Sequence, residues 1–148
     1  MSNGQGIEKL VALCIRRWGA VNLGTYSNRD KRGKKGNKSV HALYRAADVR
    51  FVTEKDRNAA FDWFTGPAAE ALKIDCVVDY AYTKRDKLGR KAYGRAWNCE
   101  KGTHTLSKGD VEGGGQAWAN WLHIEIGLSD VSENSTAFSS AWRSVPKP

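Results

Sequence analysis

Three histidines are the side chains with the most chemistry to offer: His41, His104 and His123. The first lies seven residues before Asp48, and the last lies inside residues 121–128 (WLHIEIGL), where apolar residues take every second position. A histidine between those positions points away from the core, into any cleft on that side of the strand. Zinc in hydrolases takes three ligands from His, Asp and Glu and leaves a fourth position for water. Spacing alone does not separate such a site from ordinary surface histidines.

The residues around the first histidine carry a longer pattern. Residues 39–48 (SVHALYRAAD) resemble the S-x-H-x-x-G-x-A-x-D signature of the zinc D-alanyl-D-alanine peptidases. These enzymes share their fold with the hedgehog signalling domain and lysostaphin-type peptidases, and they are common among phage lysins. The matching residues are Ser39, His41, Ala46 and Asp48. Tyr44 stands where the family has glycine.

A second segment is similar to the late strand that carries the family's last ligand. This segment is residues 121–126 (WLHIEI), and the resemblance runs in order over residues 7–128. It implies a zinc ion held by His41, Asp48 and His123. Such an ion lowers the pKa of its bound water toward about 7 and polarises the scissile carbonyl.

The resemblance also implies how the substrate side is built. Arg29 loosely matches an arginine that the family uses near the substrate, where its donors can grip a carboxylate or polarise a carbonyl. Ser39 is implied beside the first ligand and on the substrate side. Trp121 shares a strand face with His123, so we expect it to line a groove for a sugar or peptide. Packing of a long loop explains such a tryptophan nearly as well.

The general base is where this chain departs from the family. Members place a Glu three residues before the final ligand or a His two before it, and here those positions hold Asn120 and Trp121. Glu125, on the same strand face as His123, and His104, in the preceding loop, are the remaining candidates for a catalytic base. For Glu125 the competing interpretation is a salt bridge, and for His104 it is a surface loop. Whether the chain is an enzyme stays open at this point.

The charge of the chain is uneven. The 148 residues carry a net charge of +8, with 24 Lys and Arg against 16 Asp and Glu. Residues 29–38 hold six basic groups and one acidic, and residues 84–91 hold five and one. Such patches attract polyanions, either anionic wall polymers or nucleic acid. The third interpretation is a solvated surface without a partner. The sequence contains no helix-turn-helix, zinc-finger or ribonucleoprotein motif that would favour nucleic-acid binding.

The hydrophobic pattern predicts one α+β domain over residues 1–148, with a small, mainly antiparallel sheet, helices on one face and the metal site on the sheet. Expected helices are residues 6–18, 53–64 (capped by Thr53), 68–73 and 132–143 (capped by Ser132). Expected strands are residues 46–52, 74–82 and 121–128. Residues 24–38 and 84–116 read as long basic or Gly-rich loops, the second with a hairpin around Leu88-Gly89. Cys14, Cys76 and Cys99 suit neither full pairing nor a compact zinc cluster.

The resemblance to the zinc D-alanyl-D-alanine peptidases implies a zinc-dependent hydrolase of the cell wall. The expected protein is a monomeric, phage-derived metallopeptidase that cleaves peptidoglycan stem peptides and has no membrane span. Without a visible signal peptide, it would be made in the cytoplasm and act at the wall or within a phage particle. The first alternative is a non-catalytic virion or wall-binding protein on the same scaffold. The second, weaker alternative is a nucleic-acid-binding protein.

Overall fold

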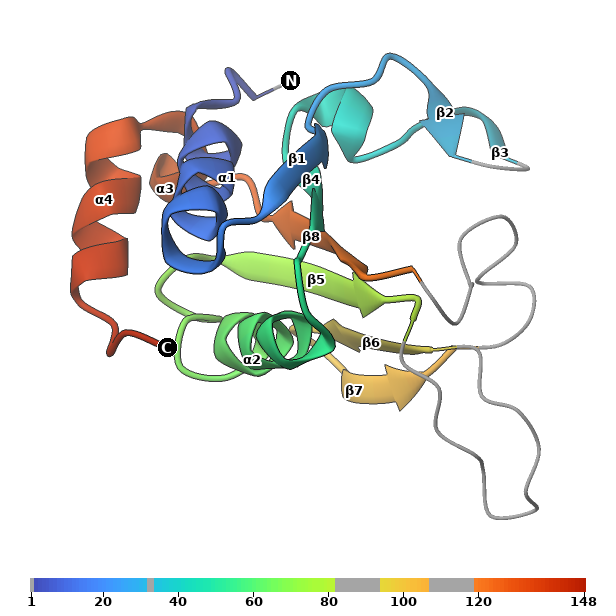
Figure 1. The fold of residues 1–148 in the computed structure, drawn as a ribbon. Coiled ribbons are helices and arrows are strands. Elements are labelled where there is room, and N and C mark those ends of the chain that lie inside the picture. The colour runs from blue at the N-terminus through green and yellow to red at the C-terminus, as the bar shows by residue number, and fades with distance from the viewer. Residues whose placement is uncertain (1, 32–33, 82–93, 107–118) are drawn as a thin grey trace, which may run out of the picture.

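The protein is an α+β domain with four α-helices and a six-stranded sheet in the part described by the computed structural model, residues 2–31, 34–81, 94–106 and 119–148 (Figure 1). The helices are α1 (Gln5–Trp18), α2 (Glu54–Thr65), α3 (Asp130–Glu133) and α4 (Ser135–Arg143), and a short 3₁₀ turn, η1, spans His41–Leu43. The strands of the main sheet are β1 (Val21–Gly24), β4 (Ala46–Arg50), β5 (Ile74–Asp79), β6 (Arg95–Asn98), β7 (Gly102–Thr105) and β8 (Trp121–Ile126). Among these residues, none of the helices combines the length and apolarity needed to cross a membrane.

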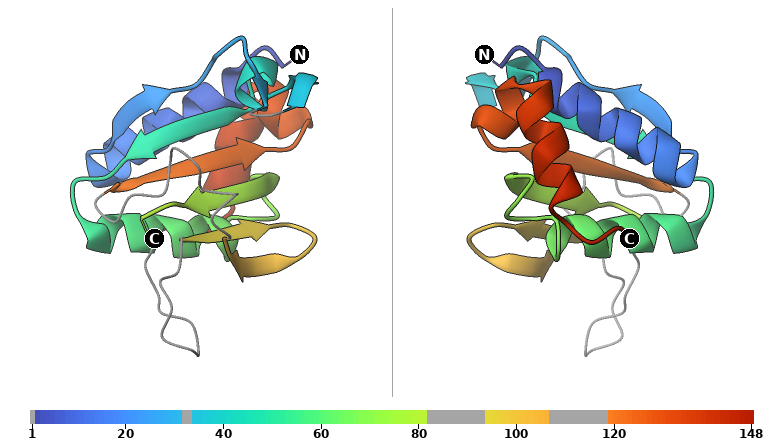
Figure 2. Two further views of the ribbon diagram at one scale, coloured as in Figure 1. Left: turned by 90° about the vertical axis from the view of Figure 1, so that its right-hand side faces the viewer. Right: turned by 90° about the vertical axis from the view of Figure 1, so that its left-hand side faces the viewer.

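The main sheet has the order β1-β4-β8-β5-β6-β7, and every neighbouring pair in it is antiparallel. The helices cover one face of this sheet, as the two side views show (Figure 2). We call the opposite side the open face. Strand β8 lies between β4 and β5, so side chains from three strands meet at its centre. The predicted fold class is confirmed.

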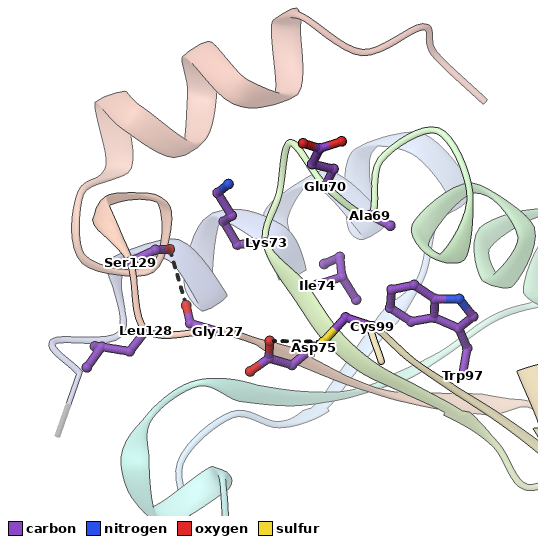
Figure 3. Close-up of a pocket in the computed structure, with 10 residues that line it drawn as sticks. All are labelled: Ala69, Glu70, Lys73, Ile74, Asp75, Trp97, Cys99, Gly127, Leu128 and Ser129. Carbon is purple, nitrogen blue, oxygen red and sulfur yellow. Dashed lines mark hydrogen bonds between the residues drawn. The ribbon is translucent and has the colours of Figure 1, made fainter. Parts of the chain in front are cut away.

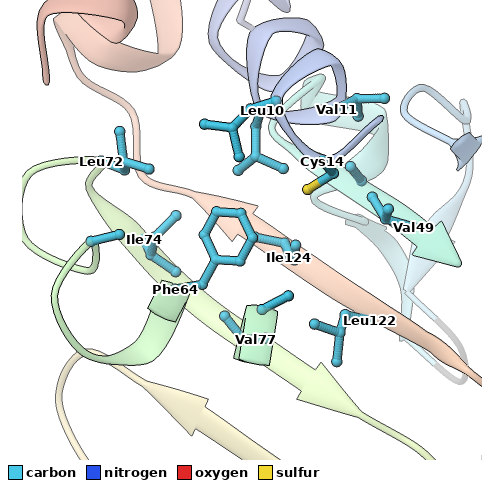
Figure 4. Packing of buried hydrophobic residues seen from close by; sticks show 14 of the residues in the cluster. Leu10, Val11, Cys14, Val49, Phe64, Leu72, Ile74, Val77, Leu122 and Ile124 are labelled. Carbon is cyan, nitrogen blue, oxygen red and sulfur yellow. The ribbon is translucent and has the colours of Figure 1, made fainter. Parts of the chain in front are cut away.

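The alternation in β8 decides which side chains enter the core. Leu122, Ile124 and Ile126 are fully buried under the helices, whereas His123 and Glu125 point to the open face and stay partly exposed. Figure 4 shows Leu122 and Ile124 packed among side chains of α1, α2 and β5. Burying an aliphatic side chain of this kind contributes about 1.5–3 kcal/mol. The core therefore sets the register of β8, and with it the face on which the histidine lies.

Local signals place the first two helices as predicted. Gly19 follows α1 in the left-handed conformation (φ 61°), which closes the helix by donating its N–H to the last carbonyls. The Thr53 hydroxyl accepts a hydrogen bond from the Asp56 N–H at 3.0 Å, which caps α2. Because α2 follows β4 after a short connection, the Thr53 cap fixes where the chain turns after the strand that carries Asp48.

The prediction of a basic loop over residues 24–38 misses two strands. These residues contain a separate two-stranded sheet, β2 (Asp30–Lys31) paired with β3 (Lys34–Lys38). Every residue of β3 is exposed, so this hairpin has no buried face and leaves no hydrophobic alternation to read. Strand β1, which pairs with β4 at the edge of the main sheet, was also not predicted.

The loop predicted over residues 84–116 is likewise wrong where the structure describes it. Strands β6 and β7 form an antiparallel pair there, with Ala96 opposite His104. Both are only four residues long, and they exist because β6 pairs with β5. The hairpin predicted around Leu88-Gly89 lies outside the described residues.

Residues 68–73, the last helix and the end of the last strand also differ from prediction. Residues 68–73 form a series of turns rather than a helix, since the chain must reverse into β5 and does so through Lys73 in the left-handed region (φ 54°). The last helix is two: Ser129 caps α3, and Asn134, extended at φ −133°, breaks the helix and caps α4. Ser132 lies inside α3 and completes its capping box. Leu128 follows the strand and is 72% exposed.

Candidate metal centre

Strand pairing brings two of the predicted ligands together. Asp48 in β4 lies directly opposite His123 in β8, and both side chains point to the open face. The Asp48 Oδ1 atom is 2.9 Å from His123 Nδ1. Directly opposed residues of an antiparallel pair have close Cβ atoms, so this contact is a consequence of the register that the core imposes.

His41, in the turn η1, is the third predicted ligand, and together with Asp48 and His123 it forms what we call the group. Its side chain is buried, and its Nε2 atom lies 3.3 Å from Asp48 Oδ2. This buried nitrogen makes no hydrogen bond. The imidazole rings of His41 and His123 have centroids 5.0 Å apart. The structure thus brings all three predicted ligands to one point, where one donor atom from each lies within 4.8 Å of the others.

In each histidine, the ring nitrogen that faces away from Asp48, here called the outer nitrogen, contacts a hydrogen-bond acceptor. His41 Nδ1 lies 3.1 Å from the main-chain oxygen of Thr25, and His123 Nε2 lies 2.8 Å from Glu125 Oε1. Protons on these outer nitrogens leave lone pairs on the inner ones, directed at the Asp48 carboxylate. Histidines that bind metals are oriented by carbonyl and carboxylate partners in this way. A cation between the three groups would accept these lone pairs and the carboxylate as its ligands.

The contacts among these side chains shift the pKa values of Asp48 and His123. Burial by itself would raise the pKa of Asp48, but the contacts with His123 and His41 outweigh it and hold that pKa well below its usual range. Burial by itself would lower the pKa of His123, but the hydrogen bonds to Asp48 and Glu125 raise it to about 9. In the absence of a metal, the group therefore stabilises a proton on His123.

The residues present fit a small divalent cation. A tetrahedral zinc ion with bonds of about 2.0–2.1 Å separates its ligand atoms by about 3.4 Å. Asp48 Oδ2 lies 3.3 Å from His41 Nε2, and Asp48 Oδ1 lies 2.9 Å from His123 Nδ1. One donor atom from each of the three residues lies within 4.8 Å of the others, which is the scale of such a site. Two neutral imidazoles and one carboxylate form a ligand set that suits zinc and leaves a coordination position for water.

Tyr44 explains the shape of the turn that carries His41. It is in the left-handed conformation (φ 57°), where glycine is favoured, and it occupies the position that is glycine in the resembling signature. Its ring stacks on Tyr26 with centroids 5.4 Å apart, and its hydroxyl donates to Glu8 Oε1 at 2.8 Å. The ring also lies against Gly4, where any Cβ would collide with it. These contacts offset the backbone cost, which is roughly 1–2 kcal/mol.

The residues predicted beside the substrate have different environments. Ser39 is buried, and its hydroxyl accepts a hydrogen bond from the Ala42 N–H at 3.3 Å, which closes the turn that leads into η1. Arg29 is exposed at the base of the β2–β3 hairpin, where its main chain bonds to Ser27 and Ser39. Trp121 lies on the open face, two residues from His123, with its ring 4.8 Å from that of Tyr80.

The two predicted catalytic bases, Glu125 and His104, lie in different places. Glu125 is in the group, but its carboxylate binds the outer nitrogen of His123, away from Asp48. His104 is exposed on β7, three strands from β8 by the pairing His123–Val78–Ala96–His104, a distance of about 14 Å at the usual strand spacing. The structure does not bring His104 to the ligands.

Asn120 occupies one of the family's base positions, and its side chain has a structural partner on each side. It accepts from Arg57 Nη1 at 2.7 Å and donates to the Phe51 carbonyl at 2.6 Å. Arg57 is itself buried and also pairs with Asp79 at 3.2 Å. Asn120 therefore ties the start of β8 to α2 and to the end of β4.

Sequence reasoning missed two participants in this site. The Thr25 oxygen that orients His41 belongs to the main chain, and no side-chain motif reports a carbonyl. Tyr80 follows β5 and reaches Trp121 only through the pairing of β5 with β8. Its proximity to the site could have been inferred only after the strand order was known.

A separate pocket lies where β5 begins and β8 ends (Figure 3). Its volume is about 460 Å³, and Trp97 and Ile74 contribute apolar walls. The Cys99 thiol lies 3.9 Å from Asp75 Oδ1 at its edge. None of the predicted site residues lines this pocket, so it is distinct from the metal-ligand group.

No family model matches the chain, and neither a curated protein nor a solved structure matches it.

Proposed function

We propose that the protein is a zinc-dependent peptidase that acts on the stem peptides of peptidoglycan. The observation that carries the proposal is the buried Nε2 atom of His41, which has no hydrogen bond and converges with Asp48 and His123. The contact of this nitrogen with Asp48 Oδ2 at 3.3 Å is not a hydrogen bond. Because a buried nitrogen without a hydrogen bond is costly, a ligand shared with Asp48 best explains its position. The left-handed backbone at Tyr44 supports the likeness to the peptidase signature, which has glycine there.

Each residue of the group has a distinct task in this proposal. His41, Asp48 and His123 would hold the metal, while the Thr25 carbonyl and Glu125 orient the two imidazoles. When bound, zinc would supply a water of lowered pKa and a Lewis acid for the scissile carbonyl. Asp48 and His123 lie on the face of the sheet that the described helices leave uncovered (Figure 2), and their side chains are 25% and 14% exposed.

Metal analysis of the purified protein tests the proposal first. We expect one zinc per chain, lost in His41→Ala, with His104→Ala as the matched histidine control that keeps it. Cleavage of purified peptidoglycan, followed by mass spectrometry of the released stem peptides, then tests the activity. Zinc-free protein with no affinity for added zinc would refute the metal site. A zinc-loaded protein that releases no peptide would refute the peptidase.

A second candidate is a wall-binding protein that keeps the metal and lacks hydrolysis. It is favoured by the groups at the base positions: Asn120 is bound to Arg57 and Phe51, Trp121 cannot take a proton, and Glu125 is engaged with His123. Sedimentation with peptidoglycan that depends on zinc but releases no peptide would support this candidate. Peptide release that depends on the zinc ligands would refute it.

A further inference from the structure

The pocket at the start of β5 combines an apolar wall with a carboxylate (Figure 3). Ile74 and the half-buried Trp97 provide the apolar side, and Asp75, the next residue of β5, provides the carboxylate. The volume of about 460 Å³ lies within the range of small-molecule sites, about 300–1,000 Å³. The pocket therefore has room for a small ligand or for one long side chain of a partner.

The carboxylate of Asp75 has only weak partners among the residues that the structure describes. Its Oδ1 atom lies 3.9 Å from the Cys99 thiol, and its Oδ2 atom lies 3.7 Å from Arg45 Nη1. A thiol is a weak donor, and 3.7 Å is too long for a hydrogen bond. That Arg45 nitrogen donates instead to the Ile126 carbonyl at 2.8 Å. Because a carboxylate accepts several hydrogen bonds, Asp75 can still accept donors from a ligand.

The surroundings of Asp75 favour a cation, although the whole chain carries a net charge of +8. Partial burial raises the pKa of Asp75; Arg45 lowers it, and the nearby carboxylates of Glu125 and Glu100 raise it again. The Lys73 side chain lines the same pocket, but it points away from Asp75 (Figure 3). A positive group brought to Asp75 would therefore meet an excess of negative charge.

We propose that this pocket binds the ammonium end of an aliphatic amine, the chemistry of a lysine side chain, with Asp75 as its ion-pair partner. The three donors of an ammonium suit the acceptors of the carboxylate. The methylene chain packs on Ile74 and Trp97, and an indole ring attracts a nearby cation. Gly127 leaves room for this arrangement, because a Cβ there would lie 2.8 Å from Asp75 Oδ1. None of the metal ligands lines the pocket, so the inference goes beyond the proposed function.

The test compares two ligands by NMR titration of the ¹⁵N-labelled full chain. They are Nα-acetyl-L-lysine N-methylamide and the norleucine analogue, which lacks only the ammonium. We expect the lysine compound to shift the indole N–H signal of Trp97, assigned with Trp97→Phe, and to bind about tenfold more tightly than the analogue, the size of effect that a charge-assisted hydrogen bond produces. Asp75→Asn should remove this preference, and Gly127→Ala should weaken it by displacing the carboxylate. Asp62→Asn, which changes an exposed carboxylate on α2, should retain it.

Each outcome decides for or against the ammonium site. Equal binding of the two compounds, no binding of the lysine compound, or binding that leaves the Trp97 signal unchanged overturns it. An unchanged preference in Asp75→Asn also overturns it, and Gly127→Ala decides the question if Asp75→Asn does not fold. Cadaverine then identifies the source of the amine: tighter binding than the lysine compound indicates a free diamine, and weaker binding indicates a lysine side chain of a peptide.

Discussion

Replacing Glu125 distinguishes a residue that orients a metal ligand from a catalytic base. Its Oε1 atom lies 2.8 Å from His123 Nε2, and the removal of such a partner typically weakens metal binding about 10–100-fold. We therefore expect Glu125→Ala to weaken zinc binding by that factor. Glu125→Gln keeps an oxygen that can accept the Nε2 proton but loses the charge, which lowers the strength of the hydrogen bond by about half. It should weaken zinc binding by about tenfold or less.

Competition with a chelator of known zinc affinity measures both variants, and Glu100→Ala, an exposed carboxylate between β6 and β7, is the control. Peptide release by each variant at saturating zinc provides the second measurement. Native zinc affinity in Glu125→Ala would refute the orienting role. If Glu125→Gln bound zinc as the native protein does and yet released no peptide, Glu125 would be the base and our interpretation of its geometry would be wrong.

Four further predictions follow from the same contacts. Zinc must displace the proton that His123 carries below its pKa of about 9, so chelator competition should show affinity rising about tenfold per pH unit from pH 6.5 to 8; a flat profile would contradict this. Because that pKa is raised above the usual 6.5 or so, its contribution to the stability of the metal-free protein is complete below about pH 6.5 and is lost as the pH rises through 9. Tyr44→Phe removes the hydrogen bond to Glu8 and should lower the free energy of unfolding in urea by about 1 kcal/mol with zinc affinity unchanged; loss of zinc would show that the hydroxyl does more. Asn120→Ala leaves the buried Arg57 without one acceptor and should cost about 2–3 kcal/mol in the same assay, whereas a neutral result would mean that this contact is dispensable.

The metal-ligand group was accessible from the sequence because two kinds of signal coincide there. Residues 121–126 alternate strictly, which placed His123 on the face opposite the core. The pattern at residues 39–48 named His41 and Asp48 together. The buried apolar residues of β4 and β8 then determine a register that sets Asp48 opposite His123.

The missed elements lack such signals for physical reasons. Strand β3 is exposed along its whole length, so it has no apolar side to create a period. Strands β6 and β7 are held by pairing with β5, a contact between distant segments that local composition does not encode. The division of the last helix at Asn134 could not be predicted because Ser129, Ser132 and Asn134 are all suitable helix caps. Every residue type has a main-chain carbonyl, so no sequence signal marks the Thr25 carbonyl that orients His41.

Residues 2–4 contact the turn that carries the first candidate ligand, His41. The Ser2 N–H donates to the Leu43 carbonyl at 2.9 Å, and Gly4 provides the flat surface against which the Tyr44 ring lies. Residues 2–4 thus brace the turn that aims His41 at its partners. An affinity tag or a truncation at this end would act on the first ligand from some forty residues away, so biochemical work on zinc binding should place its tag at the carboxyl end.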